Sequence, residues 1–293
     1  MPKSISTCAL LAAALLLSNS GCDRKVIMTV GLPSIIGAVL VDSGAGGVNT
    51  QAHVDVDGTR LLPVVAVNND TLTLRDYGST GEYMWTSSWQ GFELRLAPGD
   101  PCALHVYQSD GEATTDTVVI PHLPKVVSPD TNFVLGKNQS LSVAWVATEG
   151  VDRYELAFDV HYRYYHGGYT TFSMDTTVLV PAGTSTYTLP GAAIFPSDVD
   201  SLIEGYCIIT VTAETGPNIG SESKGNVNGK GCGYFFASGT QESWCFIGGY
   251  PSMDVPCPRL ARPTAEQLVE RKRALIGRMG QSLKVQSPFS RED

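Results

Sequence analysis

Short segments that alternate apolar and polar residues, each closed by a turn-forming cluster, constrain the fold of this chain more than any other feature. Apolar side chains occupy every second position in residues 51–56 and again in residues 141–146, which places them on one face of an extended strand. Clusters of Gly, Asp, Asn and Pro separate such segments at residues 43–47, 57–58, 68–70, 98–101 and 110–111. Short strands with regularly spaced turns are typical of β-sandwiches and barrels. The sequence therefore predicts an all-β protein.

Length and composition set limits on the number of domains and on the partners. A chain of 293 residues has room for about two domains of roughly 150 residues each. The hydrophobic content of 43% is sufficient for packed cores and too high for a disordered chain. The formal net charge of -9 argues against a dedicated nucleic-acid binder, which would carry a basic stripe.

The N-terminal segment has the features of an export signal. Lys3 precedes an unbroken apolar run of nine residues, Ala9–Leu17, which is shorter than the about 20 residues that a membrane-spanning helix needs. Small residues then lead to Cys22, and the segment resembles a bacterial lipoprotein signal (residues 1–22). This resemblance implies that Cys22 is lipidated and that the protein is membrane-anchored in the bacterial cell envelope, facing the periplasm or the cell exterior. Ordinary cleavage near Ser18 and Ser20 is the alternative.

Residues 23–120 are expected to form the first β-domain. The stretches AHVDVDGT, GEYMW and FELRLAPGDPCALHVYQSDG resemble the carboxypeptidase regulatory-like family of β-sandwiches, which implies a non-catalytic spacer or attachment module. His53, Asp55 and Asp57 share one strand face. Three such donors can hold a cation, but we interpret them as a solvated face opposite the core.

Residues 121–129 contain three prolines and are expected to form a stiff linker to a second domain, residues 130–247. The stretches LSVAWV, TSTYTLPGAAI and LIEGYCIITVTAETG resemble a fibronectin type III domain, and Trp145 matches the core tryptophan of that family. The fold expected from both resemblances is two consecutive Ig-like or fibronectin III-like β-sandwiches with a short C-terminal helix.

A tyrosine-rich hairpin is the most distinctive surface candidate. In HYRYYHGGY, Gly167-Gly168 is a strong hairpin-turn signal. The candidate binding residues beside this turn are Tyr162, Tyr164, Tyr165 and Tyr169. Tyrosine offers rigid amphipathic contact area, so an envelope protein or a glycan is the expected partner. The alternative is that cross-strand aromatic pairs only stabilise the hairpin.

Five cysteines remain after Cys8 and Cys22, and four of them lie between residues 207 and 257. In an oxidising envelope this clustering favours disulfides. The proposed pairs are Cys232 with Cys245, which flank an expected hairpin, and then Cys207 with Cys257. Four cysteines allow three connectivities, and a zinc site is the less favoured rival because no C-x-x-C pair is present. The fifth cysteine, Cys102, is expected to be a buried thiol.

The tail, residues 248–293, is expected to contain a basic amphipathic helix. Thr264 and Gln267 form a capping box, and the helix should run to about Arg278. Arg271, Lys272 and Arg273 make it basic. Such a helix can lie on a membrane, dock on a partner or pack on its own chain.

Sequence motifs for catalysis are missing. The chain has no H-E-x-x-H, P-loop, G-x-G-x-x-G or G-x-S-x-G motif, so we expect no enzyme, no cofactor and no metal site. The expected function is a non-enzymatic, membrane-anchored envelope lipoprotein that acts as a binding, adhesion or spacer module. The alternative is a structural accessory subunit of an envelope assembly that docks through its C-terminal basic helix.

Overall fold

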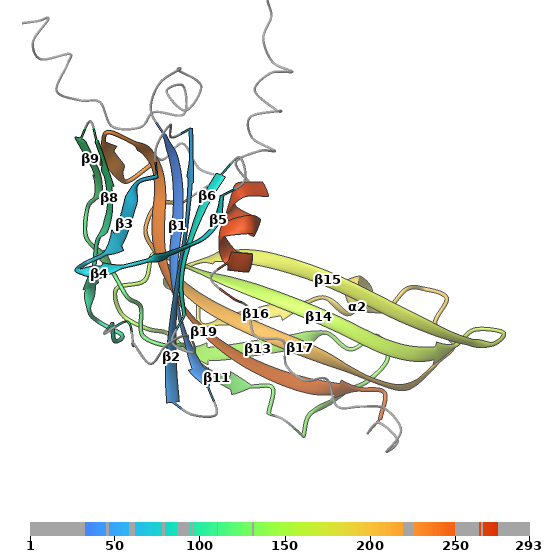
Figure 1. Cartoon of the computed structure of the whole chain (residues 1–293). Helices are drawn as coiled ribbons and strands as arrows, with labels where there is room; N and C mark the ends of the chain where they lie inside the picture. Colours follow the sequence, from blue (N-terminus) through green and yellow to red (C-terminus); the bar gives the residue numbers. More distant parts are fainter. Residues whose placement is uncertain are drawn as a thin grey trace, which may run out of the picture.

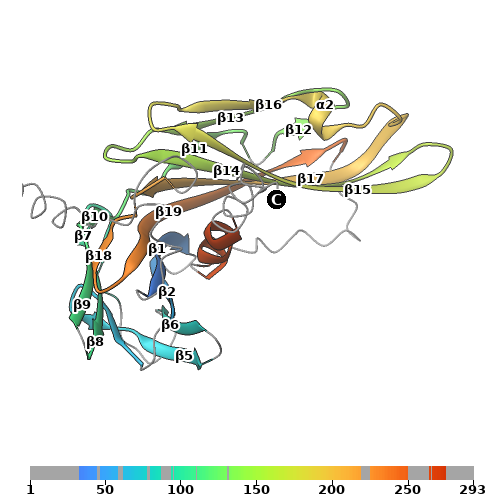
Figure 2. The same cartoon turned by 90° about the horizontal axis from the view of Figure 1, so that it is seen from above.

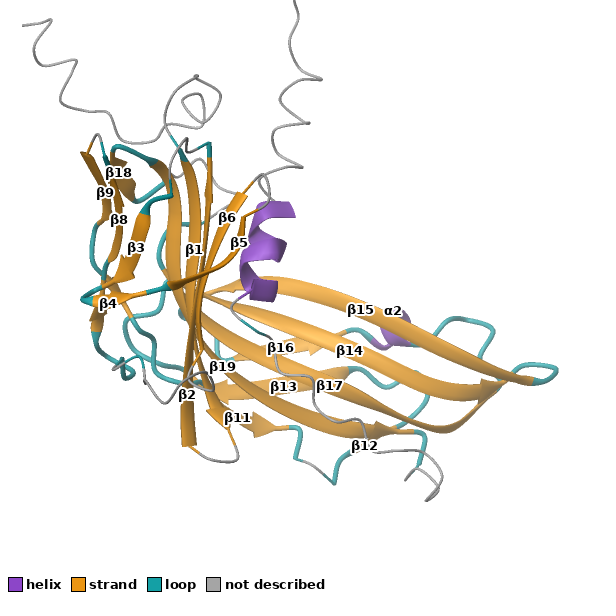
Figure 3. Cartoon of the chain, in the orientation of Figure 1, coloured by secondary structure: helices purple, strands orange, loops and turns teal. Residues whose placement is uncertain are grey.

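Strands dominate the structure (Figure 3). This computed structural model describes residues 33–44, 47–58, 62–77, 80–86, 94, 96–109, 111–130, 132–218, 225–249, 264 and 266–274. The prediction of an all-β protein is confirmed. The described helices are the single turn α2 (Gly191–Ile194) and residues 266–274. In the described part of the chain, no helix has the length and apolar character to span a membrane.

The first region of the molecule, at the upper left of Figure 1, is built mainly by the N-terminal strands. Val39 on β1, Val54 on β2 and Leu104 on β8 are fully buried in its core, as the alternating pattern predicts. Its strands are β1 (Ser34–Gly44), β2 (Gly47–Asp57), β3 (Val64–Val67), β4 (Asp70–Thr71), β5 (Thr73–Tyr77), β6 (Thr80–Thr86), β7 (Pro101–Cys102), β8 (Leu104–Gln108), β9 (Gly111–Thr115) and β10 (Val118–Val119).

The second region has two layers with a core between them (Figure 2). One layer is a three-stranded sheet in the order β11-β13-β16, and the other contains β15, β14, β17 and β19 in that order. Leu141, Val143 and Trp145 on β13 point into the core between the layers. The strands are β11 (Lys125–Ser128), β12 (Val134–Leu135), β13 (Leu141–Val146), β14 (Arg153–Tyr165), β15 (Tyr169–Pro181), β16 (Thr186–Leu189), β17 (Ser201–Thr215) and β19 (Cys232–Ile247). The short strand β18 (Val227–Gly229) pairs with β9, so it belongs to the first region.

Strand β19 belongs to both regions. Its first half pairs in parallel with β1, and its second half pairs antiparallel with β17. Phe235 therefore lies in the first core and Ile247 in the second. The start of β19, CGYFFA, is buried on both faces, as a near-continuous apolar run indicates. A division of the chain at residues 121–129 would separate β1 from β19, one of the two strands with which it pairs.

The C-terminal helix, residues 266–274, packs on the side of β1 and β19 that faces away from the first core. Leu268 and Val269 are buried there against Ile36, Tyr234 and Phe236. The predicted capping box is confirmed, because the Gln267 N–H donates to Thr264 Oγ1 at 3.2 Å and the Thr264 N–H donates to Gln267 Oε1 at 3.0 Å. The predicted end of the helix near Arg278 lies outside the described residues.

Candidate binding surface

The β14–β15 hairpin extends beyond the rest of the molecule (Figures 1 and 2). Its two strands have 13 residues each and pair without a register shift. Residues 166–168 connect them, with Gly167 at a φ of 63°. That left-handed conformation favours glycine, so the predicted hairpin turn is confirmed. The ladder continues to Tyr165 and Tyr169, so the turn lies at the far end of the hairpin.

Two of the four candidate tyrosines are core residues. Tyr162 is only 2% exposed, Tyr164 is also buried, and the Tyr162 hydroxyl donates a hydrogen bond of 2.9 Å to the Ile194 carbonyl oxygen. Burial, with smaller contributions from Tyr164 and Asp198, raises the pKa of Tyr162. The prediction that these two tyrosines belong to a binding surface is wrong. They alternate with polar residues along β14, and in this strand the alternation points the tyrosines inward.

The other two tyrosines lie exposed at the end of the hairpin. Tyr169 is 76% exposed and Tyr165 is 45% exposed. Their rings meet edge to face, with centroids 5.9 Å apart. The Arg163 guanidinium carbon lies 5.7 Å from the centroid of the Tyr169 ring, and Arg163 also donates to Glu204 at 3.1 Å. We call Arg163, Tyr165 and Tyr169 the tip.

A pair of carboxylates lies further along the same hairpin. Asp159 on β14 is directly opposite Asp175 on β15. Burial raises the pKa of Asp159; Asp175 also raises it, whereas His161 lowers it. The His161 Nε2 atom lies 2.5 Å from Asp159 Oδ1. Asp175 is exposed on β15 and, among the described residues, has no ion-pair partner.

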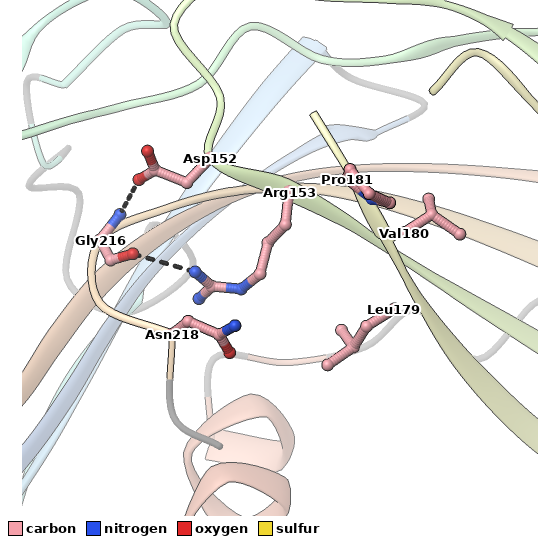
Figure 4. A pocket seen from close by; sticks show the side chains of 7 residues that line it. All are labelled: Asp152, Arg153, Leu179, Val180, Pro181, Gly216 and Asn218. Carbon is pink, nitrogen blue, oxygen red and sulfur yellow. Dashed lines mark hydrogen bonds between the residues drawn. The ribbon is translucent and has the colours of Figure 1, made fainter. Parts of the chain in front are cut away.

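A hollow of about 550 Å³ lies at the other end of the hairpin, shown in Figure 4. The Arg153 guanidinium is one of its polar lining groups, and it donates to Glu214 Oε2 at 2.7 Å and to the Gly216 carbonyl oxygen at 2.9 Å. Asp152 accepts a hydrogen bond of 2.8 Å from the Gly216 N–H. These hydrogen bonds connect the start of β14 with the end of β17. We therefore interpret the polar groups of the hollow as structural contacts between the two strands. Its lining residues are Asp152, Arg153, Leu179, Val180, Pro181, Gly216 and Asn218.

Buried charges attach the C-terminal helix to the second region. Lys272 is 2% exposed, and its Nζ atom donates to Glu214 at 3.0 Å and to Glu155 at 3.4 Å. Arg271 donates to Glu155 at 2.8 Å. Glu155 alternates with the core residues Tyr154 and Leu156 along β14, so it lies on the outer side of the sheet, and the helix covers that side. The sequence feature that indicates this contact is the run of three basic residues, 271–273, in a chain whose net charge is -9.

The same helix also covers the polar face of β2. Arg273 forms an ion pair with Asp55, and His53 Nε2 lies 2.9 Å from Asp55 Oδ1. His53 and Asp55 are buried, so the interpretation of this face as solvated is wrong for both. Across the described residues, no group of three or more His, Cys, Asp or Glu side chains is arranged to hold a metal ion.

The cysteines do not pair as the sequence suggested. Cys232 and Cys245 lie near opposite ends of the single strand β19, about 43 Å apart at the rise of a strand, so the predicted disulfide between them is wrong. No hairpin separates them. Cys207 instead lies directly opposite Cys245. Hydrogen bonding to Cys245 and burial raise the pKa of the Cys207 thiol.

The four cysteines in the described part of the chain, Cys102, Cys207, Cys232 and Cys245, are buried free thiols. This agrees with the expectation for Cys102. The lipidation candidate Cys22 and the disulfide candidate Cys257 lie outside the described residues. Lipidation and the pairing of Cys207 with Cys257 therefore stay predictions.

The comparisons with protein-family models and with curated proteins gave the same result. No protein-family model matches the sequence, and no curated protein matches it either. The geometry of the tip and of the hairpin is therefore the basis for assigning a function.

Proposed function

We propose that the protein is a non-enzymatic binding module of the bacterial cell envelope, anchored to a membrane through lipidated Cys22, that presents the tip to a partner protein or glycan. The observation that carries this proposal is the exposure of Tyr165 and Tyr169 at the end of a projecting hairpin. Exposed tyrosines held by an arginine are typical of recognition surfaces. The ladder and the buried tyrosines behind the tip provide a rigid support.

We also propose that the second region is a fibronectin type III-like sandwich and the first a carboxypeptidase regulatory-like sandwich. The strand order β11-β13-β16 opposite β15-β14-β17-β19 supports the fibronectin type III-like assignment of the second region. Trp145 is buried between these two layers. In this arrangement the first region would act as a spacer near the membrane.

The accessory-subunit alternative, docking through the C-terminal helix, has less support. Arg271, Lys272 and Arg273 all contact carboxylates of their own chain. Separating the helix from the sheet would leave buried Glu155 and Glu214 short of cations, which is strongly unfavourable. The tip needs no such rearrangement to meet a partner.

A photo-cross-linking amino acid at position 169 tests the proposed function in cells that carry the full chain. The matched control has the same group at Tyr107, which is 44% exposed and stacked on His105 in the first region. We expect an adduct of defined mass from position 169 and none from position 107. Equal adducts at both positions, or none at 169, would contradict the proposal. Cys22→Ala should release the protein from the membrane fraction if Cys22 carries the anchor.

A further inference from the structure

Strand β15 presents a long open edge. It pairs with β14 along all 13 residues, and among the described strands it has no other partner. Figure 1 shows it at the upper margin of the second region. Natural proteins protect such edges with lysine, proline, bulges or short strands. β15 has no lysine, no register shift, and its only proline is the last residue, Pro181.

The side chains of β15 suit the addition of another strand. Phe172, Met174 and Val178 are only half buried against the second core, so a neighbouring strand with apolar side chains on that side would complete their cover. On the other side Thr171, Ser173 and Thr177 are exposed. Six of the 13 residues are threonine or valine, which favour strands.

Charge distinguishes between possible occupants of this edge. Asp175, near the middle of β15, is its only charged residue, and it lies opposite Asp159. A second copy of this chain, paired antiparallel about Asp175, would gather four carboxylates, and its net charge of -9 would add to the repulsion. Like charges opposite one another destabilise a sheet, whereas opposite charges stabilise it. A basic segment fits better than a second copy.

We propose that the open edge of β15 binds an extended segment of another polypeptide as an added strand, with a lysine or arginine beside Asp175 and apolar side chains beside Phe172 and Met174. Main-chain hydrogen bonds would supply affinity, and the two rows of side chains would supply specificity. This inference rests on the proposed function and names the class of partner that the hairpin would take. The tip lies at the start of the same strand, so one partner would contact both.

The test uses the mature full chain and a labelled peptide of alternating threonine and valine with a central lysine. We expect fluorescence anisotropy to show binding and hydrogen exchange to show protection of the β15 amides. The same peptide with a central glutamate should bind about three- to tenfold more weakly, the range for a changed cross-strand charge pair. A peptide N-methylated at alternate residues should not bind, because it cannot form the ladder.

Two protein variants test whether Asp175 itself determines the charge preference for the peptide. Asp175→Lys should reverse the preference, so that the glutamate peptide binds more tightly than the lysine peptide. Asp116→Lys, at an exposed position between β9 and β10, adds the same charge elsewhere and should preserve the original preference. Equal reversal in both variants would overturn the assignment of Asp175.

The remaining outcomes separate this proposal from the proposed function. If no peptide protects the β15 amides, or the N-methylated peptide binds equally well, strand addition is wrong; an adduct at position 169 would then still support the tip. Protection of β15 that depends on protein concentration without peptide would identify a second copy as the occupant and overturn the proposal. If the lysine peptide protects β15 but position 169 forms no adduct, the edge proposal holds and the tip is wrong.

Discussion

Lys272 lies between two buried carboxylates, with its Nζ atom 3.0 Å from Glu214 Oε2 and 3.4 Å from Glu155 Oε2. Glu155 is on β14, Glu214 is on β17, and the lysine comes from the C-terminal helix. Glu214 also forms an ion pair with Arg153, whose Nε atom lies 2.7 Å from Glu214 Oε2. The last described helix is therefore an integral part of the second region, and its stability should depend on these contacts.

We predict that Lys272→Met lowers the free energy of unfolding by about 3 kcal/mol, because removing one partner of a buried ion pair leaves uncompensated charge. Chemical denaturation followed by tryptophan fluorescence measures the change. The control is Arg75→Ala, which breaks the exposed ion pair of Arg75 with Glu266 on the same helix. That pair should contribute less than about 1 kcal/mol. Equal losses in the two variants would show that helix tethering, and not buried charge, is the cause.

Leu268 tests the apolar part of the same interface. We predict that Leu268→Ala destabilises the protein by about 2–4 kcal/mol, because it removes a buried side chain and leaves a cavity beside Phe236. Leu179→Ala, at a position 46% exposed on β15, should change stability by less than about 0.5 kcal/mol. Thermal unfolding of both variants gives the comparison. A small effect of Leu268→Ala would mean that the helix does not pack as described.

The tyrosines of the hairpin should separate into two classes. Tyr162→Phe removes the hydrogen bond to the Ile194 carbonyl and should cost about 1 kcal/mol of stability. Tyr169→Phe removes an exposed hydroxyl and should leave stability within about 0.5 kcal/mol. Denaturant titrations of the two variants, made in parallel, measure this difference. Similar losses would contradict the assignment of Tyr162 to the core.

The buried thiol of Cys102 should make the protein less stable in alkaline solution. Burial raises the pKa of its thiol from 9.0 to about 12 in the folded protein, so above pH 9 the unfolded chain releases a proton that the folded chain retains. This contribution to stability is complete below pH 9 and is lost as the pH rises toward 12. We expect the free energy of unfolding to fall less steeply with pH for Cys102→Ala than for the unsubstituted protein. The two slopes should differ by about 1.4 kcal/mol per pH unit. Parallel slopes for the two proteins between pH 9 and 10.5 would contradict this prediction.

Strand alternation made much of the local structure predictable. Val54, Leu141 and Trp145 are buried as their period of two requires, and the turn at Gly167 and the capping box at Thr264 follow from local hydrogen bonding and backbone conformation. The same alternation could not assign the tyrosines of β14 to a side, because a tyrosine suits either a core or a surface. Only the packing of Tyr162 against Phe172 and Phe195 makes that choice.

The sequence by itself determined the elements: strands, turns and a basic capped helix, each fixed by neighbours within a few residues. Tertiary structure alone decided how the elements combine. It placed β1 beside β19, more than 180 residues later, set Cys207 opposite Cys245, and brought Lys272 to Glu155 and Glu214. Strand partners and ion pairs that are distant in sequence depend on which faces remain uncovered after the cores have packed, and no local pattern of residues records that information.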